Sequence, residues 1–362
     1  MKKWIIGFAM LYMLTVPVSA TSITAPEPPR DAESLLPDDR DSFSEGVWYV
    51  LRAGVQACLP DVSKTVGICA SLLGTCLLLS LLRTYDGRSK PIVQLAGVIA
   101  IAGLLVENTG SMIQIGADTV TELSEYGKML IPVMTAALAS QGGGTSAAAI
   151  YTATALFDAV LSSGVATLLV PGIYIYLIIS IVNAAAGDSI LQKMRDFIKW
   201  ALSWGLKLIL YVFTGYISIT GIISGTADQT AIKAAKLTFN GMIPVVGGII
   251  SDASETILIG ASVVKNSVGI AGMLILLSIV IVPFLKIGVL YLLLKLTAAV
   301  CAMFCDKEIV VLIEDFSAAY GLLLAMTGTV ALLFLISAAA VTVKKYSRMA
   351  FIIQFLSKNR LC

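Results

Sequence analysis

The sequence predicts an all-α protein, a polytopic transmembrane helical bundle of about six to seven spans. Hydrophobic residues make up 57% of its 362 residues and charged residues only 13%, whereas a soluble domain carries about 25% charged residues. The mean hydropathy is +0.90. The apolar residues gather in runs long enough to cross a bilayer, and the basic residues cluster at the ends of those runs. The composition is therefore that of a membrane protein.

The absence of histidine weakens every enzymatic interpretation. Histidine is the commonest general base and a usual zinc ligand, and this chain has none. No phosphate-binding loop, HExxH or GxSxG pattern occurs either. We therefore expect no enzymatic activity, no catalytic residue, no cofactor and no metal. The formal net charge of +2 also argues against a nucleic-acid partner.

The cysteines carry no recognisable motif. There are six, and none forms a CxxC pair: Cys58, Cys69, Cys76, Cys301, Cys305 and Cys362. We interpret them as small apolar side chains in or beside helices. A structural disulfide or a metal site is the alternative.

Residues 1–20 are predicted to be a signal peptide. Two lysines precede an apolar run, and Val18 and Ala20 are the small residues that signal peptidase reads. Cleavage is expected after Ala20, which leaves the mature N-terminus outside the cytoplasm.

Two short segments are expected before the first span. Residues 21–46 contain seven acids against two arginines, among prolines and serines, and are predicted to be a disordered extracytoplasmic leader. Residues 47–60 are predicted to be an amphipathic helix at the outer interface. In this segment apolar residues recur every four positions until Pro60 ends the pattern.

Residues 62–126 are predicted to be a first membrane hairpin. The span over 62–82 ends in Arg83, Arg88 and Lys90, which the positive-inside rule places in the cytoplasm. Residues 91–106 return outward. The acidic stretch 107–128 is then expected to be an outer loop.

An internal repeat is predicted in the rest of the chain, with units at 127–225 and 240–340. Pro132 and Pro244 stand in the same Ile-Pro-Val triplet, and Pro171 and Pro283 stand in the same Val-Pro pair. Both pairs are 112 residues apart. In each unit we expect a re-entrant Ile-Pro-Val segment, a long helix interrupted by proline, an amphipathic connector and a final span. Such repeats are common in transporters, and coincidence among apolar residues is the alternative.

Residues 344–362 are predicted to be a basic amphipathic tail. An even number of spans in each unit places this tail outside, whereas its basic residues favour the cytoplasm. We resolve the conflict in favour of the charges, by predicting that residues 269–302 fold as a hairpin turning near Pro283 and Lys286.

Ionisable residues in or beside apolar runs are the candidates for a pathway, because they are costly in a bilayer. Lys286 is the first candidate, although a position in water at a turn explains it equally well. Asp252 and Glu255 follow the second Ile-Pro-Val segment and are candidates for lining a cavity, or are loop and capping acids. Asp158 and Glu107 are weaker candidates. The prolines complete the set of candidate pathway or structural residues: Pro132, Pro171, Pro244 and Pro283.

The stretch from Lys233 to Gly272 reads KAAKLTFNGMIPVVGGIISDASETILIGASVVKNSVGIAG. It resembles the most recognisable block of the stage III sporulation protein AE family, and the predicted signal, leader and order of spans are similar too. The resemblance implies a component of the SpoIIIA–SpoIIQ complex, made in the mother cell and placed in the outer forespore membrane. It implies other SpoIIIA-type membrane and ring proteins and SpoIIQ as partners, beside the lipid bilayer. It implies no catalytic residue.

We therefore expect a multi-pass cell-membrane component of a channel or secretion complex that connects mother cell and forespore and is needed for forespore development. A stand-alone secondary transporter is one alternative, suggested by the repeat and by Lys286. A membrane scaffold that anchors ring proteins and conducts nothing is the other.

Overall fold

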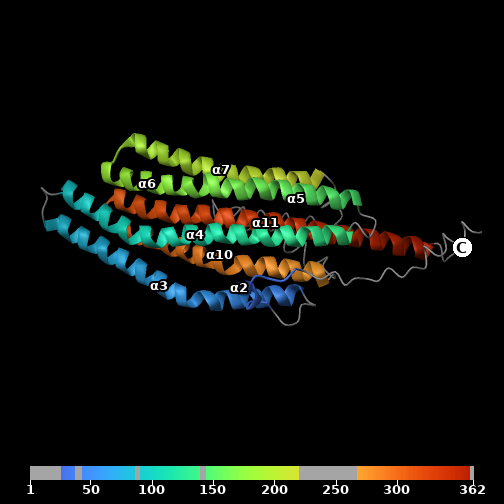
Figure 1. Cartoon of the computed structure of the whole chain (residues 1–362). Coiled ribbons are helices and arrows are strands. Elements are labelled where there is room, and N and C mark those ends of the chain that lie inside the picture. Colours follow the sequence, from blue (N-terminus) through green and yellow to red (C-terminus); the bar gives the residue numbers. More distant parts are fainter. Residues whose placement is uncertain (1–25, 37–42, 86–89, 139–143, 220–266, 359–362) are drawn as a thin grey trace, which may run out of the picture.

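The fold is a bundle of long helices, seen here in a computed structural model that describes residues 26–36, 43–85, 90–138, 144–219 and 267–358 (Figure 1). Within these ranges the chain is helical and contains no strand. The helices are α2 (Arg30–Glu33), α3 (Phe43–Tyr85), α4 (Lys90–Leu138), α5 (Gly144–Gly164), α6 (Val170–Ala186), α7 (Ser189–Ile219), α10 (Ser267–Cys301) and α11 (Lys307–Lys358). Six helical stretches in the described part are long and apolar enough to cross a membrane. The predicted class, an all-α polytopic bundle, is confirmed.

Consecutive spans run in opposite directions, with α5 and α6 lying end to end as one span. The turns from α6 to α7, at residues 187–188, and from α10 to α11, at residues 302–306, lie at one end of the bundle, which we name the connector end. The end of α11 lies toward the opposite end, as do the start of α3, the end of α7 and the start of α10 (Figure 1). The described bundle therefore begins and finishes at the same end.

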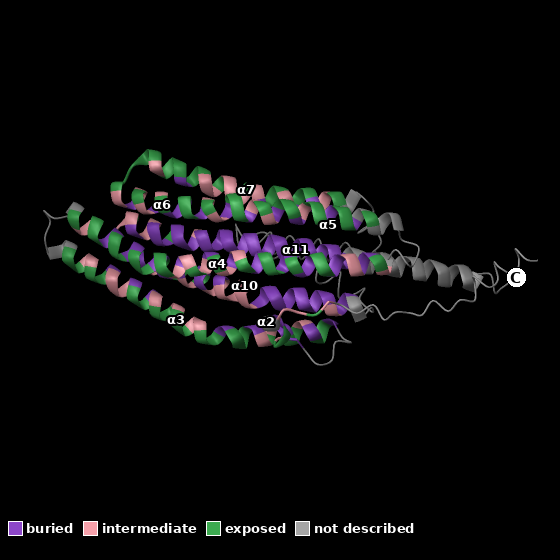
Figure 2. Ribbon diagram, in the orientation of Figure 1, coloured by how far each residue is buried: buried purple, intermediate pink, exposed green. Residues whose placement is uncertain are grey.

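Helix α11 occupies the centre of the bundle. Helices α4, α5, α6, α7 and α10 all pack against it, and its most apolar stretch is completely buried (Figure 2). Its buried hydroxyl groups are satisfied locally. Thr329 donates to the carbonyl of Ala325 in the same helix, and Ser337 shares a hydrogen bond of 2.7 Å with Thr154 of α5. A central helix of this kind needs no water around it, because its polar atoms already have partners.

The outer surface of the bundle carries the apolar side chains that lipid contact requires. Helices α3, α4, α6 and α7 each expose several large hydrophobic residues. Examples are Leu78, Leu81, Ile92, Ile99, Ile175, Ile178, Trp204 and Tyr211. A soluble bundle would have polar residues there. This arrangement agrees with helices that pack against one another inside the bundle and face hydrocarbon outside.

Helix α4 approaches α11 closely at a glycine. A Cβ atom added at Gly127 would overlap the ring of Phe334, which is itself almost completely buried. At Gly103 of the same helix an added Cβ would meet nothing within 4 Å. Small residues at helix contacts let backbones approach each other in membrane bundles. Gly127 is therefore a packing position, whereas Gly103 is not.

Three predicted breaks are absent because the helices continue through them. The helix expected to end at Pro60 is part of α3, which runs to Tyr85 with Pro60 inside it. The acidic stretch 107–128, predicted as an outer loop, belongs to α4. The Ile-Pro-Val segment at Pro132 forms the last turns of α4 rather than a separate re-entrant element. Proline is tolerated inside long membrane helices because neighbouring groups satisfy the freed carbonyl.

Pro171 and Pro283 stand inside long helical runs, as predicted, but they act differently. Before Pro171 the chain forms one turn of π-helix, Val165–Leu169, that joins α5 to α6. A proline lacks the N–H that continues the hydrogen-bond ladder, and a π-turn is a usual local adjustment. Pro283 lies within the continuous helix α10. Each predicted unit thus contains a proline-bearing helix and a following antiparallel helix, while the repeat itself stays a prediction.

The predicted hairpin within residues 269–302 is wrong, because α10 is one helix from Ser267 to Cys301. Six described spans give an even count. An N-terminus outside the cytoplasm and a C-terminal tail inside it, both expected from the charges, are therefore incompatible. The tail is instead the continuation of α11 as far as Lys358.

The disorder predicted for the leader is wrong for residues 26–36, which the structure describes. Within residues 26–36, Ala32 and Leu36 are buried, and the short helix α2 packs against α10. Disorder was expected from the acids, but two apolar residues suffice to hold this segment on the bundle. The predicted signal peptide with Ala20, and the second Ile-Pro-Val segment with Pro244, Asp252 and Glu255, lie outside the described residues.

Candidate functional site

A buried ion pair links three helices near the connector end. Nη1 of Arg195, on α7, lies 3.0 Å from Oδ2 of Asp315, on α11. The hydroxyl of Tyr176, on α6, donates to the other carboxylate oxygen of Asp315 at 2.9 Å. Arg195 also donates to Asp196 at 2.8 Å. Arg195 and Asp315 are both less than one-tenth exposed, so this network holds the α6–α7 hairpin onto the central helix.

The sequence related Arg195 and Asp315 only through the alignment of the two predicted repeat units. Asp196 and Asp315 are 119 residues apart, so they occupy equivalent positions in the predicted repeat if its second unit contains a seven-residue insertion. They stand in Arg195-Asp196-Phe197 and Glu314-Asp315-Phe316. In the structure both acids contact the same Arg195. In the sequence, the only signal for this site is an arginine and an acid among apolar helical residues. Only the fold brings the two side chains together.

Asp158 is the most buried of the candidate residues named from the sequence, with only 3% of its surface exposed. It lies on α5 and accepts hydrogen bonds from Ser124 on α4, at 3.0 Å, and from Ser162, at 3.3 Å. Lys128 of α4 is 3.7 Å away and mostly exposed. A buried carboxylate needs such partners. Asp158 therefore joins α4 and α5 by a small polar network.

Lys286, the first candidate, is paired. Its Nζ lies 2.9 Å from Oδ2 of Asp61 on α3, and Asp61 is also 3.6 Å from Lys64. The side chains of Lys286 and Asp61 are about one-third exposed. The lysine stays within α10 rather than at a turn, and Asp61 compensates its charge. This geometry gives Lys286 a structural role between the first span and α10.

We expect Lys286→Met to lower the stability of the bundle by only about 1 kcal/mol, because partly exposed ion pairs contribute little. Spore formation should stay unchanged. The measurement is the thermal unfolding of the detergent-solubilised protein, beside a count of heat-resistant spores. The exchange of both charges, Lys286→Asp with Asp61→Lys, should restore the wild-type stability. Loss of spores at unchanged stability would instead assign Lys286 to a transport path.

An exposed polar stripe runs along α4 where the sequence predicted a loop. Its members are spaced so that they share one face of the helix, and all are exposed: Glu107, Ser111, Gln114, Asp118, Thr121, Glu122 and Glu125. At about 1.5 Å per residue the stripe is roughly 27 Å long. We name it the α4 polar stripe. Only Glu107 was a candidate from the sequence, because the others were assigned to a loop.

The comparisons with known proteins agree with one another. The model of a family described as stage III sporulation protein AE matches residues 40–344. A curated relative, stage III sporulation protein AE of Bacillus subtilis (strain 168), is 26% identical over 302 residues, which cover 82% of this chain and 75% of the relative. No solved structure matches.

Proposed function

Because this chain belongs to the stage III sporulation protein AE family, we propose that it is the multi-spanning membrane component of a complex that joins mother cell and forespore during sporulation. The family match extends over most of the chain and includes the described helices from α3 to α10 and α11 as far as residue 344. The six apolar helices supply the membrane part of such a complex. As the resemblance implies, its partners would be SpoIIIA-type membrane and ring proteins and SpoIIQ. Its place would be the outer forespore membrane, and its role would be forespore development.

The filled centre of the bundle bears on how such a component could conduct. The axis of the described bundle is occupied by α11, whose apolar stretch is completely buried. A path through the middle of one chain would have to displace this helix and its hydrogen bonds to α5 and α10. We therefore place any path at the surface of the bundle, between copies of the chain or between the chain and its partners.

The α4 polar stripe is the observation that carries the conducting form of this proposal. A charged side chain in the middle of a bilayer costs about 2.5–3.5 kcal/mol on insertion scales. The exposed carboxylates of Glu107, Asp118 and Glu125 along this face therefore need water or a polar partner rather than lipid. The stripe is nearly as long as the hydrocarbon core is thick, about 30 Å. An aqueous path between α4 and a neighbouring subunit satisfies these requirements.

The scaffold is the second candidate, and the buried α11 favours it, because a solid bundle can anchor ring proteins without conducting anything. In that case the α4 polar stripe would lie above the bilayer or against a partner. The stand-alone transporter has less support. Its main residue, Lys286, is held by Asp61 in a pair that joins two helices.

Neutralising the α4 polar stripe distinguishes the two forms. The double variant Glu107→Gln with Asp118→Asn keeps the size of both side chains and removes two charges. Produced in its spore-forming host in place of the wild type, it should lower heat-resistant spores by roughly tenfold. A path wall of one charge sign changes the local concentration of passing ions by at least about that factor. The amount of protein in the membrane should stay the same.

The matched control is Glu308→Gln with Glu314→Gln, which also removes two acids but from the start of α11 at the connector end. It should sporulate normally. Normal spore counts in the stripe variant would contradict the conducting form and leave the scaffold. If both variants lower the number of heat-resistant spores at equal protein levels, spore formation depends on the total charge of the protein and not on the α4 polar stripe.

A further inference from the structure

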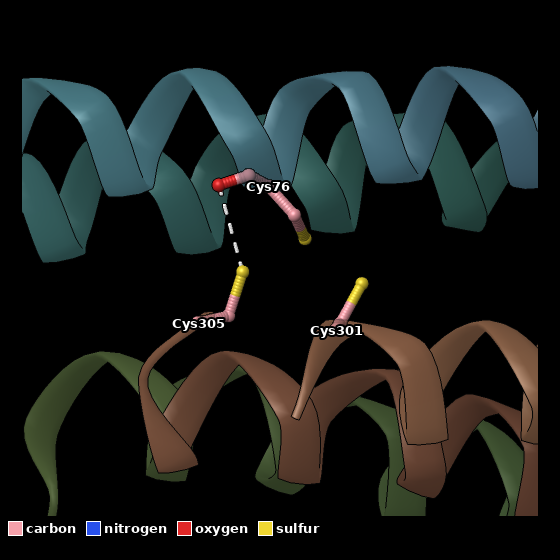
Figure 3. Close-up of side chains that lie close together, drawn as sticks. All are labelled: Cys76, Cys301 and Cys305. Carbon is pink, nitrogen blue, oxygen red and sulfur yellow. Dashed lines mark hydrogen bonds between the residues drawn. The ribbon is translucent and has the colours of Figure 1, made fainter. Parts of the chain in front are cut away.

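Three cysteines that are far apart in the sequence meet near the connector end. Cys76 lies on α3, Cys301 is the last residue of α10, and Cys305 is in the turn that leads to α11. Their three Sγ atoms all lie within 4.8 Å of one another, and Figure 3 shows the side chains of Cys301 and Cys305 directed toward α3. Cys76 and Cys301 are completely buried, and Cys305 is partly exposed. We name this group the cysteine cluster.

Backbone geometry holds the cluster together. The N–H of Cys305 donates to the carbonyl of Cys301 at 2.8 Å, so the chain makes one more helical turn past the end of α10. That turn puts the side chains of these two residues, four positions apart, on the same side. The thiol of Cys305 lies 3.5 Å from the carbonyl oxygen of Cys76. The turn at the end of α10 therefore contacts α3 through the thiol of Cys305.

The spacing of the sulfurs is close to that of a thiolate metal site. Zinc binds sulfur at about 2.3 Å, so two sulfurs of a tetrahedral site lie roughly 3.8 Å apart. Shifts of about 1 Å or less, available to side-chain torsions, bring the cysteine cluster to that distance. The donors are sulfur alone, which selects soft or borderline cations. A bound cation would replace the protons of the thiols.

We propose that Cys76, Cys301 and Cys305 bind one Zn²⁺ ion. Each thiol releases its proton to solvent and binds as a thiolate, and a water molecule fills the fourth position on the partly exposed side of Cys305. Three thiolates with Zn²⁺ carry a net charge of −1, whereas with Cu⁺ they would carry −2. The smaller residual charge favours Zn²⁺ in a buried site, where an uncompensated charge is costly. The ion would fasten the first span to the α10–α11 hairpin.

Metal analysis of the full-length protein tests this site. The protein is purified in detergent with a reductant, incubated with Zn²⁺ and passed through a desalting column, and its zinc is then measured by mass spectrometry. One zinc ion per chain is expected. Replacing Zn²⁺ by Co²⁺ should give the sulfur-to-cobalt charge-transfer absorption of a thiolate site. Cys301→Ser and Cys305→Ser should each weaken binding by more than about a hundredfold, since even outer partners of a metal site contribute up to that factor.

The matched control is Cys58→Ser, a buried cysteine on α3 outside the cluster, together with Cys362→Ser to remove the terminal thiol. Both should retain zinc. A second measurement does not depend on the folding of a variant: Zn²⁺ should raise the unfolding temperature of the wild type, and a chelator should reverse the rise. The proposal would be overturned by less than one zinc ion per chain, by an equal loss of zinc in the controls or by a preference for Cu⁺. A disulfide within the cluster that persists in the presence of the reductant would also overturn it.

Discussion

Asp315→Ala is expected to destabilise the bundle by about 3–5 kcal/mol, the usual cost of removing one partner of a buried ion pair. The substitution leaves the guanidinium of Arg195 buried without its main counter-charge, and it removes the acceptor of the Tyr176 hydroxyl. Helices α6 and α7 lose their polar connection to α11 together. The measurement is unfolding of the purified protein in mixed micelles, with loss of helical circular dichroism as the signal.

Two variants show whether burial is the cause. Asp196→Ala removes the second acid on Arg195, but Asp196 is more than half exposed, so the loss should be at most about 1 kcal/mol. The double variant Arg195→Met with Asp315→Leu removes both buried charges and should recover most of the stability. An equal loss in Asp196→Ala, or no recovery in the double variant, would contradict a buried pair at Asp315.

Gly127→Ala is expected to destabilise the protein by about 1–3 kcal/mol, the usual cost of inserting a methyl group into a filled core. The new Cβ would overlap the Phe334 ring, and that ring is enclosed by the bundle and cannot move away freely. Either α4 and α11 separate locally or the ring leaves its rotamer. The same unfolding measurement detects the change.

Gly103→Ala is the matched control, because it makes the same substitution in the same helix where an added Cβ meets nothing within 4 Å. There alanine should stabilise the helix by roughly 0.5–1 kcal/mol, since glycine is the poorer helix former. Phe334→Leu should partly suppress the Gly127→Ala defect by opening space. Equal effects at the two glycines would show that helix propensity and not packing governs both positions.

Apolar runs predicted the fold class because each run is recognised as a span from its own residues during membrane insertion. A stretch of about twenty apolar residues specifies a span wherever it occurs in a chain. The limits of the helices were not predictable in the same way. Pro60 and the acids of 107–128 are local signals for an end, and packing along α10 and α11 overrides them. Propensity is a weak prior where tertiary contacts continue along a helix.

The candidate sites were harder to predict, since each depends on a pair that is distant in sequence. Lys286 stood out as a charge in an apolar run, but its partner Asp61 lies on the first span. The spacing of Cys301 and Cys305 was visible in the sequence, whereas Cys76 joins them only in the folded chain. Residue type identified Lys286 and Asp158, whereas Arg195, Asp315 and the cysteine cluster were recognised only from the helix arrangement.

The position of α11 has a consequence for how the protein is made. The helix at the centre is the last of the described helices to leave the ribosome, so α4 and α10 enter the bilayer before the helix against which they pack most extensively exists. The helices therefore assemble into the bundle after they have been inserted into the bilayer, and the bundle is complete only when α11 has been synthesised. A chain that stops before α11 would contain five inserted helices without a common core. Cellular quality control would recognise it as an unassembled protein.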